Sequence, residues 1–219
     1  MKSFRSMGLA IALNALLGTS AGAQDTKNAM LFDYPTAAIS QLGRADAPEV
    51  AKAAGVISSE WNFIEDSFRN IGSPSKNFRL AMNHNKELLQ TAADDPNGKL
   101  SMELVGYVEE DLAIKSNYIR GRSTQATVSA AIYSEVAVDV RTMKNGGEID
   151  GYIIGFSPRH MAGSDPLIKF NNPTNPSEGS LPPGRYEMMA ILNNQVVQRQ
   201  EVSIGILGQK GEPIICLVP

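Results

Sequence analysis

The chain has 219 residues, of which 42% are hydrophobic, 20% charged and 6% aromatic, and its formal net charge is −3. These values are typical of a globular protein and exclude collagen-like, disulfide-rich, strongly disordered and multi-span membrane chains. A mildly acidic surface has no general attraction for nucleic acid or anionic lipid, so no nucleic-acid partner is expected. No segment is long and apolar enough to span a bilayer, so stable membrane insertion is not expected either.

The first 23 residues have the layout of a secretory signal peptide. Lys2 and Arg5 precede an apolar run over residues 7–17, and small residues follow it. The run is shorter than the roughly 20 residues that a membrane-spanning helix needs, so removal is favoured over anchoring. We therefore expect cleavage near Ala23-Gln24 and an extracytoplasmic protein, either periplasmic or secreted.

The next segments are a loose lead-in over 24–45, with a short helical turn after Pro35, and a helical bundle over 46–122. Between residues 46 and 71 the apolar positions alternate at spacings of four and three, which places them on one stripe of a helix. Asp46 and Glu49 predict a capping box at its start. Such a stripe can bind other helices of the same chain or a second copy. Its residues are Val50, Ala54, Ile57, Trp61, Ile64, Phe68 and Ile71.

Two further helices are predicted before the turn at 94–98 and after it. Ser73 is the expected N-cap of the first, with Pro74 in its opening turn, and the second should cover about 100–120. Short connections between amphipathic helices favour an antiparallel bundle. The consecutive acidic residues 109–111 point in different directions on a helix, and we interpret them as a solvated face.

From about residue 127 the apolar period changes from 3.6 to 2, which predicts strands. Val136, Val138 and Val140 alternate with Ala137 and polar neighbours, and hairpin turns are expected at 144–147 and 193–194. Five or six strands without crossover helices favour a small antiparallel β-sandwich over 127–219. The predicted fold class is therefore α+β, with a bundle of about three helices followed by an immunoglobulin-like sandwich.

Three segments of this second half carry a family resemblance. They are residues 147–154, the turn Leu181-Pro182-Pro183-Gly184-Arg185-Tyr186 and residues 202–205, followed by a final apolar strand. Over about 136–219 the sequence resembles the carboxypeptidase-regulatory-like and PEGA-like group of bacterial immunoglobulin-like domains, although it differs from their pattern between 158 and 180. The resemblance implies that the turn delivers Tyr186 to the core. It also implies a non-catalytic role in adhesion, surface display or linkage, and it names no ligand.

The usual signatures of catalysis are missing. The chain has two histidines, His84 and His160, and one cysteine, Cys216, so it lacks the ligand spacing of a zinc site and cannot form an internal disulfide. We expect His84 to be an exposed helix position and Cys216 a buried small hydrophobe. Ser73 and Lys76 match Ser-x-x-Lys, but the partner tripeptides of that motif do not occur. No catalytic residue, metal site or cofactor is predicted.

The long connection over 157–180 is the strongest candidate for binding. Connections beyond about 15 residues are usually functional or disordered. A short strand is expected at 167–170 in its middle. The polar side chains that could bind a ligand there are Arg159, His160, Lys169, Asn171 and Asn172.

These observations favour a non-catalytic exported binding or scaffolding protein of the cell envelope or secreted space, with a protein partner or self-association through the helical stripe. One alternative is a carbohydrate- or small-ligand-binding module that uses the 157–180 loop, which should expose at least two of the aromatic residues after 127. The other is a secreted hydrolase with a site between the two halves, in which His160 should meet acidic groups of the helices. A scaffold should expose an apolar patch.

Overall fold

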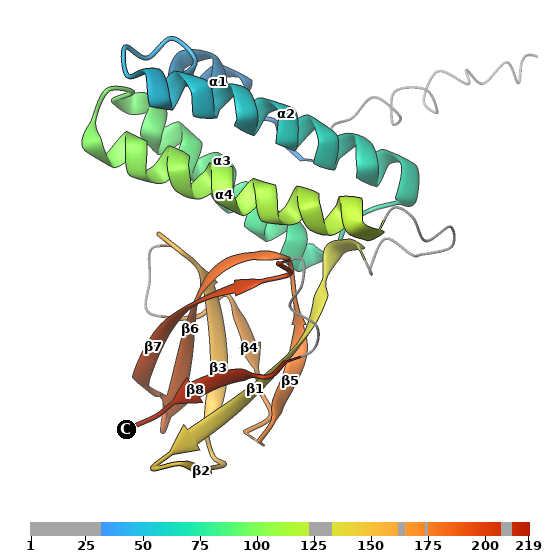
Figure 1. Cartoon of the computed structure of the whole chain (residues 1–219), viewed down its shortest axis with the longest axis vertical. Helices are drawn as coiled ribbons and strands as arrows, with labels where there is room; N and C mark the ends of the chain where they lie inside the picture. The colour runs from blue at the N-terminus through green and yellow to red at the C-terminus, as the bar shows by residue number, and fades with distance from the viewer. Residues whose placement is uncertain (1–31, 123–132, 162–164, 174, 207–211) are drawn as a thin grey trace, which may run out of the picture. The chain divides into compact units, whose positions relative to one another are not determined.

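Four helices are followed by eight strands in the part of the chain that the structure describes (Figure 1). The structure is a computed structural model, and it describes residues 32–122, 133–161, 165–173, 175–206 and 212–219. The expected signal peptide over 1–23 lies outside this part. The helices are α1 (Thr36–Leu42), α2 (Pro48–Ile71), α3 (Lys76–Asp94) and α4 (Lys99–Arg122). The α+β class is confirmed, and α1 is the short helix expected after Pro35.

Two of the helices begin later than their expected caps. Pro48 occupies the first turn of α2, and no side chain caps that helix, so the prediction of a cap at Asp46 was wrong. Proline fixes φ at the helical value and lacks the N–H that a cap would satisfy. Helix α3 is capped by Ser75 instead of Ser73, because the Ser75 hydroxyl accepts a hydrogen bond from the Phe78 amide at 3.1 Å.

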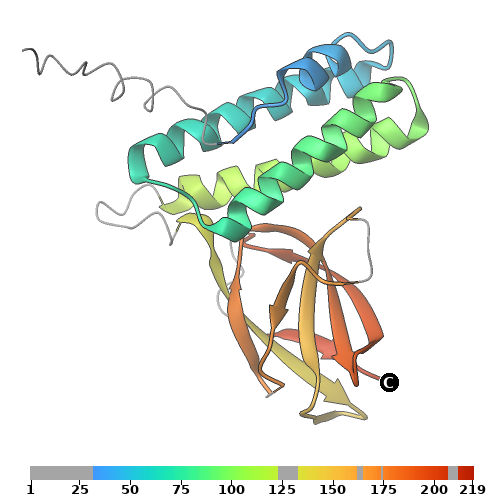
Figure 2. The same cartoon turned by 180° about the vertical axis from the view of Figure 1, so that it is seen from behind.

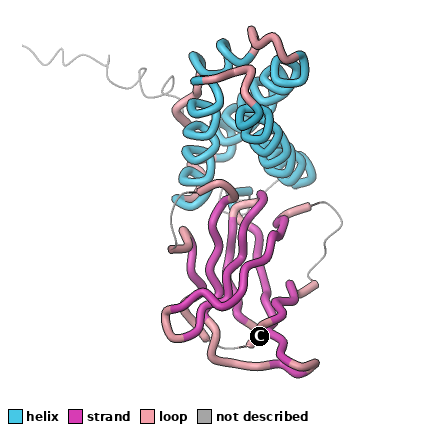
Figure 3. The backbone as a smooth tube through the Cα atoms, turned by 90° about the vertical axis from the view of Figure 1, so that its left-hand side faces the viewer, coloured by secondary structure: helices cyan, strands magenta, loops and turns pink. Residues whose placement is uncertain are grey.

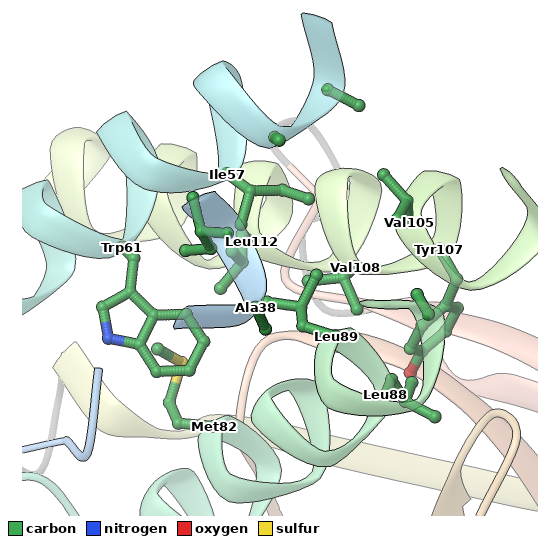
Figure 4. Packing of buried hydrophobic residues seen from close by; sticks show 14 of the residues in the cluster. Ala38, Ile57, Trp61, Met82, Leu88, Leu89, Val105, Tyr107, Val108 and Leu112 are labelled. Atoms are coloured by element: carbon green, nitrogen blue, oxygen red, sulfur yellow. The ribbon is translucent and has the colours of Figure 1, made fainter. Parts of the chain in front are cut away.

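The apolar stripe of α2 lies inside the helical region. Six of its seven residues are 1% exposed or less, and Ile71 is partly buried against the same cluster. Helix α4 packs against α2 and α3, and α1 packs against the same two helices. Figure 4 shows Ile57, Leu89 and Val108 among the side chains of this core. Each buried large side chain contributes roughly 1.5–3 kcal/mol, so the stripe is a major source of the region's stability.

The strands form two sheets that pack together (Figures 1 and 2). Every pairing is antiparallel except the parallel pairing of β8 with β1. The first sheet contains β1 (Val136–Lys144), β2 (Gly147–Glu148), β5 (Ser177–Leu181) and β8 (Ile214–Leu217). The second sheet has the order β4-β3-β6-β7 and contains β3 (Ile153–Pro158), β4 (Ile168–Phe170), β6 (Gly184–Leu192) and β7 (Gln195–Ile204).

Both predicted hairpin turns are present. Asn145 and Gly146 join β1 to β2 with φ values of 52° and 82°, and Asn193 and Asn194 join β6 to β7 with φ values of 51° and 62°. Asparagine and glycine tolerate the left-handed region that tight hairpins require. These turns set the pairing of β1 with β2 and of β6 with β7.

The sandwich has its own core between the two sheets. Tyr186 is 2% exposed there, as the family resemblance implied, and its hydroxyl donates to the carbonyl oxygen of Pro182 at 2.9 Å. Cys216 is buried in the same cluster, as expected. Figure 3 shows the helices and the strands as two separate groups of elements.

The two groups meet where α4 packs on β6. The described residues belong to one compact unit. No described helix is long and apolar enough to cross a membrane.

Candidate functional site

A buried ion pair lies where α4 meets β6. Asp111 and Lys115 are one turn apart on α4, 3% and 1% exposed, and in contact. The Asp111 carboxylate also accepts from Asn85 Nδ2 at 2.7 Å and from the Arg185 amide at 3.0 Å. The interpretation of residues 109–111 as a solvated face was therefore wrong for Asp111, because β6 covers that side of the helix.

This ion pair explains why a polar residue, Asn85, lies among the buried apolar residues of α3. The Asn85 side chain can be buried on the apolar face of α3 because it donates a hydrogen bond to the Asp111 carboxylate. Burial lowers the pKa of the Lys115 ammonium, and the charge of Asp111 opposes that shift. A lysine with a lowered pKa can act as a base, but this one is enclosed at the junction, so the pair joins the two parts of the fold.

Arg159 and His160 follow β3 and face the helices. The His160 ring packs edge to face on Tyr107 with 5.2 Å between ring centres, and Nε2 lies 3.8 Å from Glu103 Oε1. His160 has a φ of 62°. Burial, reinforced by the Arg159 charge, lowers the pKa of His160, and Glu103 partly offsets this.

His84 joins the same junction and is 5% exposed, so the expectation of an exposed helix position was wrong. Its Nε2 donates to the Arg159 carbonyl oxygen at 2.8 Å, a partner that helical periodicity cannot reveal. The Arg159 guanidinium lies 3.4 Å from Glu201. Within the described ranges neither histidine has a hydroxyl or thiol partner, and no cluster of metal-ligating side chains is present.

The remaining residues proposed from the 157–180 segment lie elsewhere. Lys169 pairs across from Gly155 on β3, four residues or about 13 Å along the strand from Arg159. Asn171 and Asn172 are exposed beyond the end of β4. The expected short strand is present as β4. The structure brings Arg159 and His160 together but places the other three residues apart from them.

A wide hollow lies in the sandwich, and none of these residues lines it. It has a volume of about 950 Å³ and is bordered by β1, β5, β7 and the start of β8. We call it the β1–β7 groove. Its lining residues are 136–139, 178–180, 200–206 and 212–214.

Strand edges border the groove. In the described part of the chain β7 pairs with β6 alone, so its other edge has no partner strand. Strand β8 pairs with β1 only from Val140 onward, which leaves residues 136–139 without a neighbour on that side among the described strands. Unpaired edges present backbone N–H and C=O groups to which another strand can bind.

The lining of the groove is apolar and acidic. It contains no lysine, arginine or histidine among the described residues. Asp139 Oδ1 is inaccessible and has no hydrogen-bond partner in that part of the chain. The acidic lining residues are Asp139, Glu178, Glu201 and Glu212, and the apolar ones are Val136, Ala137, Val138, Val202, Ile204, Ile206, Pro213 and Ile214.

Exposed apolar side chains are present both in the groove and on the outward face of β8. Ile206 lines the groove and is 44% exposed, and Ile215 and Leu217 on β8 are 43% and 66% exposed. Large exposed apolar residues that gather in one place are typical of interaction surfaces. The groove could not be predicted from the sequence because strand pairing creates it and no local motif marks it.

The aromatic residues after 127 provide no platform for a sugar ring. All five are 6% exposed or less: Tyr133, Tyr152, Phe156, Phe170 and Tyr186. The groove is therefore the best candidate for a functional site.

The chain matches no family model, no curated protein and no solved structure.

Proposed function

We propose that the chain is a non-catalytic exported binding or scaffolding protein of the cell envelope or secreted space, and that it holds a protein partner in the β1–β7 groove. The observation that carries this proposal is a hollow of about 950 Å³ bordered by strand edges that lack partner strands in the described residues. Proteins generally cover or blunt such edges, so an open one with an apolar lining favours a partner. Export rests on the signal-peptide layout of residues 1–23.

The junction between the helices and the sandwich supports a role without catalysis. A hydrolase there would need a nucleophile beside His160. His160 does meet an acidic side chain of the helices, Glu103 of α4, as the hydrolase alternative expected. Within the described ranges, however, no serine, threonine or cysteine side chain is bonded to either ring nitrogen to serve as the nucleophile that the histidine would activate. The enclosed pair of Asp111 and Lys115 is hydrogen bonded within the fold.

The position of the helical stripe also favours the groove. Residues such as Ile57 and Ile64 are fully buried in the chain's own core. Self-association through them would require the bundle to open. The resemblance of 136–219 to immunoglobulin-like domains, which are mostly accessory modules, supports the same assignment.

The proposal is tested by photo-crosslinking in the exporting cells. A photoreactive residue replaces Ser203, which lines the groove, and in a matched protein it replaces Lys52, which is exposed on α2. We expect a covalent adduct with a partner protein from position 203 and none from position 52. Equal adduct formation at both positions, or none at 203, would contradict the proposal.

A further inference from the structure

We propose that the occupant of the β1–β7 groove is an extended, basic segment of a partner protein, which adds to the free edge of β7 as a fifth strand of the second sheet. This inference rests on the proposed function and names the chemistry of the partner.

The backbone of β7 is suited to receive a strand. Its pairing with β6 is regular from Gln198 to Ile204, a length of about 23 Å. The register shift between the two strands lies outside this stretch, where Ala190 and Ile191 of β6 pair with Gln198 and Val196 of β7. Seven residues in regular register present their outward N–H and C=O groups along one line. Peptides that bind by strand addition obtain affinity from such main-chain hydrogen bonds.

The side chains of β7 predict an alternating pattern in the added strand. Val202 pairs with Tyr186, and Ile204 pairs with Gly184. Val202 and Ile204 therefore lie on the sheet face that carries the buried Tyr186 side chain. Glu201 and Ser203 lie on the opposite face. Because side chains alternate along a strand, every second residue of the partner should be apolar and the others polar.

The carboxylates of the groove select a basic partner. Asp139, Glu178 and Glu212 form no ion pair with any residue of the described ranges. Glu201 is shared with Arg159 at 3.4 Å and Arg185 at 3.8 Å, so its charge is partly neutralised. These three carboxylates, which are unpaired within the described ranges, repel an acidic segment and attract lysine or arginine.

The experiment compares three synthetic peptides of about nine residues by calorimetric titration into the purified protein. The first alternates valine and lysine, the second alternates valine and glutamate, and the third is the lysine peptide with alternate backbone amides methylated. We expect the lysine peptide to bind, the glutamate peptide not to bind, and methylation to weaken binding at least about tenfold because two or more hydrogen bonds are lost. Equal binding of the methylated peptide would overturn strand addition, and equal binding of the glutamate peptide would overturn the basic preference.

Matched variants locate the binding in the groove. Asp139→Asn and Glu178→Gln should each weaken binding of the lysine peptide about threefold or more, whereas Glu49→Gln, which removes the same charge from an exposed position on α2, should not. Hydrogen exchange of residues 200–204 should slow when the peptide binds. An effect of Glu49→Gln equal to that of the groove variants, or unchanged exchange on β7, would overturn the assignment.

The two proposals fail in different ways. If position 203 crosslinks to a partner but the lysine peptide does not bind, the basic-strand inference is wrong and the binding function stands. If the crosslinked partner is a second copy of this chain, the inference is also wrong, and a concentration-dependent dimer in light scattering would establish self-pairing. If position 203 gives no adduct, the proposed function itself fails.

Discussion

Gly184 lies directly against the carboxylate of Asp111. A Cβ atom at position 184 would be 2.5 Å from Asp111 Oδ1 and 2.8 Å from Lys115 Nζ. The turn over 181–186 therefore has two roles, because it delivers Tyr186 to the sandwich core and leaves room for the buried ion pair of α4. The helical region and the sandwich meet through this turn.

Gly184→Ala should destabilise the protein by about 1–3 kcal/mol, because the added methyl group collides with the ion pair and neither side chain has free space. The φ of 157° at this position adds to the cost for a side chain. Urea unfolding of the variant measures the loss. Gly55→Ala is the matched control, since a Cβ there meets nothing within 4 Å, and it should stabilise α2 by roughly 0.5–1 kcal/mol. Equal effects of the two substitutions would contradict the close approach of Gly184.

Asp111→Asn should lower the free energy of unfolding by about 3–5 kcal/mol, because it leaves the Lys115 ammonium buried without a counter-charge. Lys115→Met should lower the free energy of unfolding less in the Asp111→Asn protein than in the wild-type protein. In the Asp111→Asn protein the lysine is the unpaired charge, and Lys115→Met removes it. A double-mutant cycle of unfolding free energies measures this coupling. Additive costs would mean that the two charges do not act as a pair.

Much of the fold could be predicted because its signals are local. The stripe from Val50 to Phe68 and the hairpin at Asn193-Asn194 depend on periodicity and turn chemistry within a few residues. The caps were the exception within the helices. Asp46 and Ser73 are good cap residues, but Pro48 and Ser75 fix where the helices begin.

The groove and the junction between helices and sandwich could not be predicted because they depend on residues far apart in the sequence. His84 is buried through a hydrogen bond to Arg159, 75 residues away, and Asp111 through its contacts with β6. The groove arises from an edge strand and from a β8 that begins only opposite Val140. Sequence periodicity identifies strands but does not show which of their edges stay unpaired.

The pH dependence of stability should contain a contribution from His160. Its pKa lies below the ordinary value of 6.5 in the folded protein, so the unfolded chain binds the proton more readily. The contribution of His160 to stability is therefore fully present above pH 6.5 and is lost as the pH falls below that value. Asparagine tolerates the left-handed backbone at this position, so His160→Asn should make the free energy of unfolding less dependent on pH below the ordinary histidine pKa of about 6.5. An unchanged slope would show that His160 does not titrate with the fold.

Ile57→Asp should unfold the helical region rather than dissociate an oligomer. Ile57 is fully buried between helices of its own chain, and a carboxylate there would have no partner. The substitution should therefore lower the free energy of unfolding by about 4 kcal/mol or more. Circular dichroism and light scattering together measure the outcome, and Ser59→Asp at an exposed position of the same helix is the control. A fully helical monomer formed from a wild-type dimer would instead support the stripe as an interface.

The central claim is that the β1–β7 groove, and not the 157–180 segment, contacts the partner. The most direct test is to compare photo-crosslinking yields from Ser203 in the groove and from Lys169 on β4, in otherwise identical proteins expressed in the native cells. We predict one defined adduct from position 203 and no adduct of that mass from position 169. An adduct from position 169 alone would contradict the account and assign binding to the long connection.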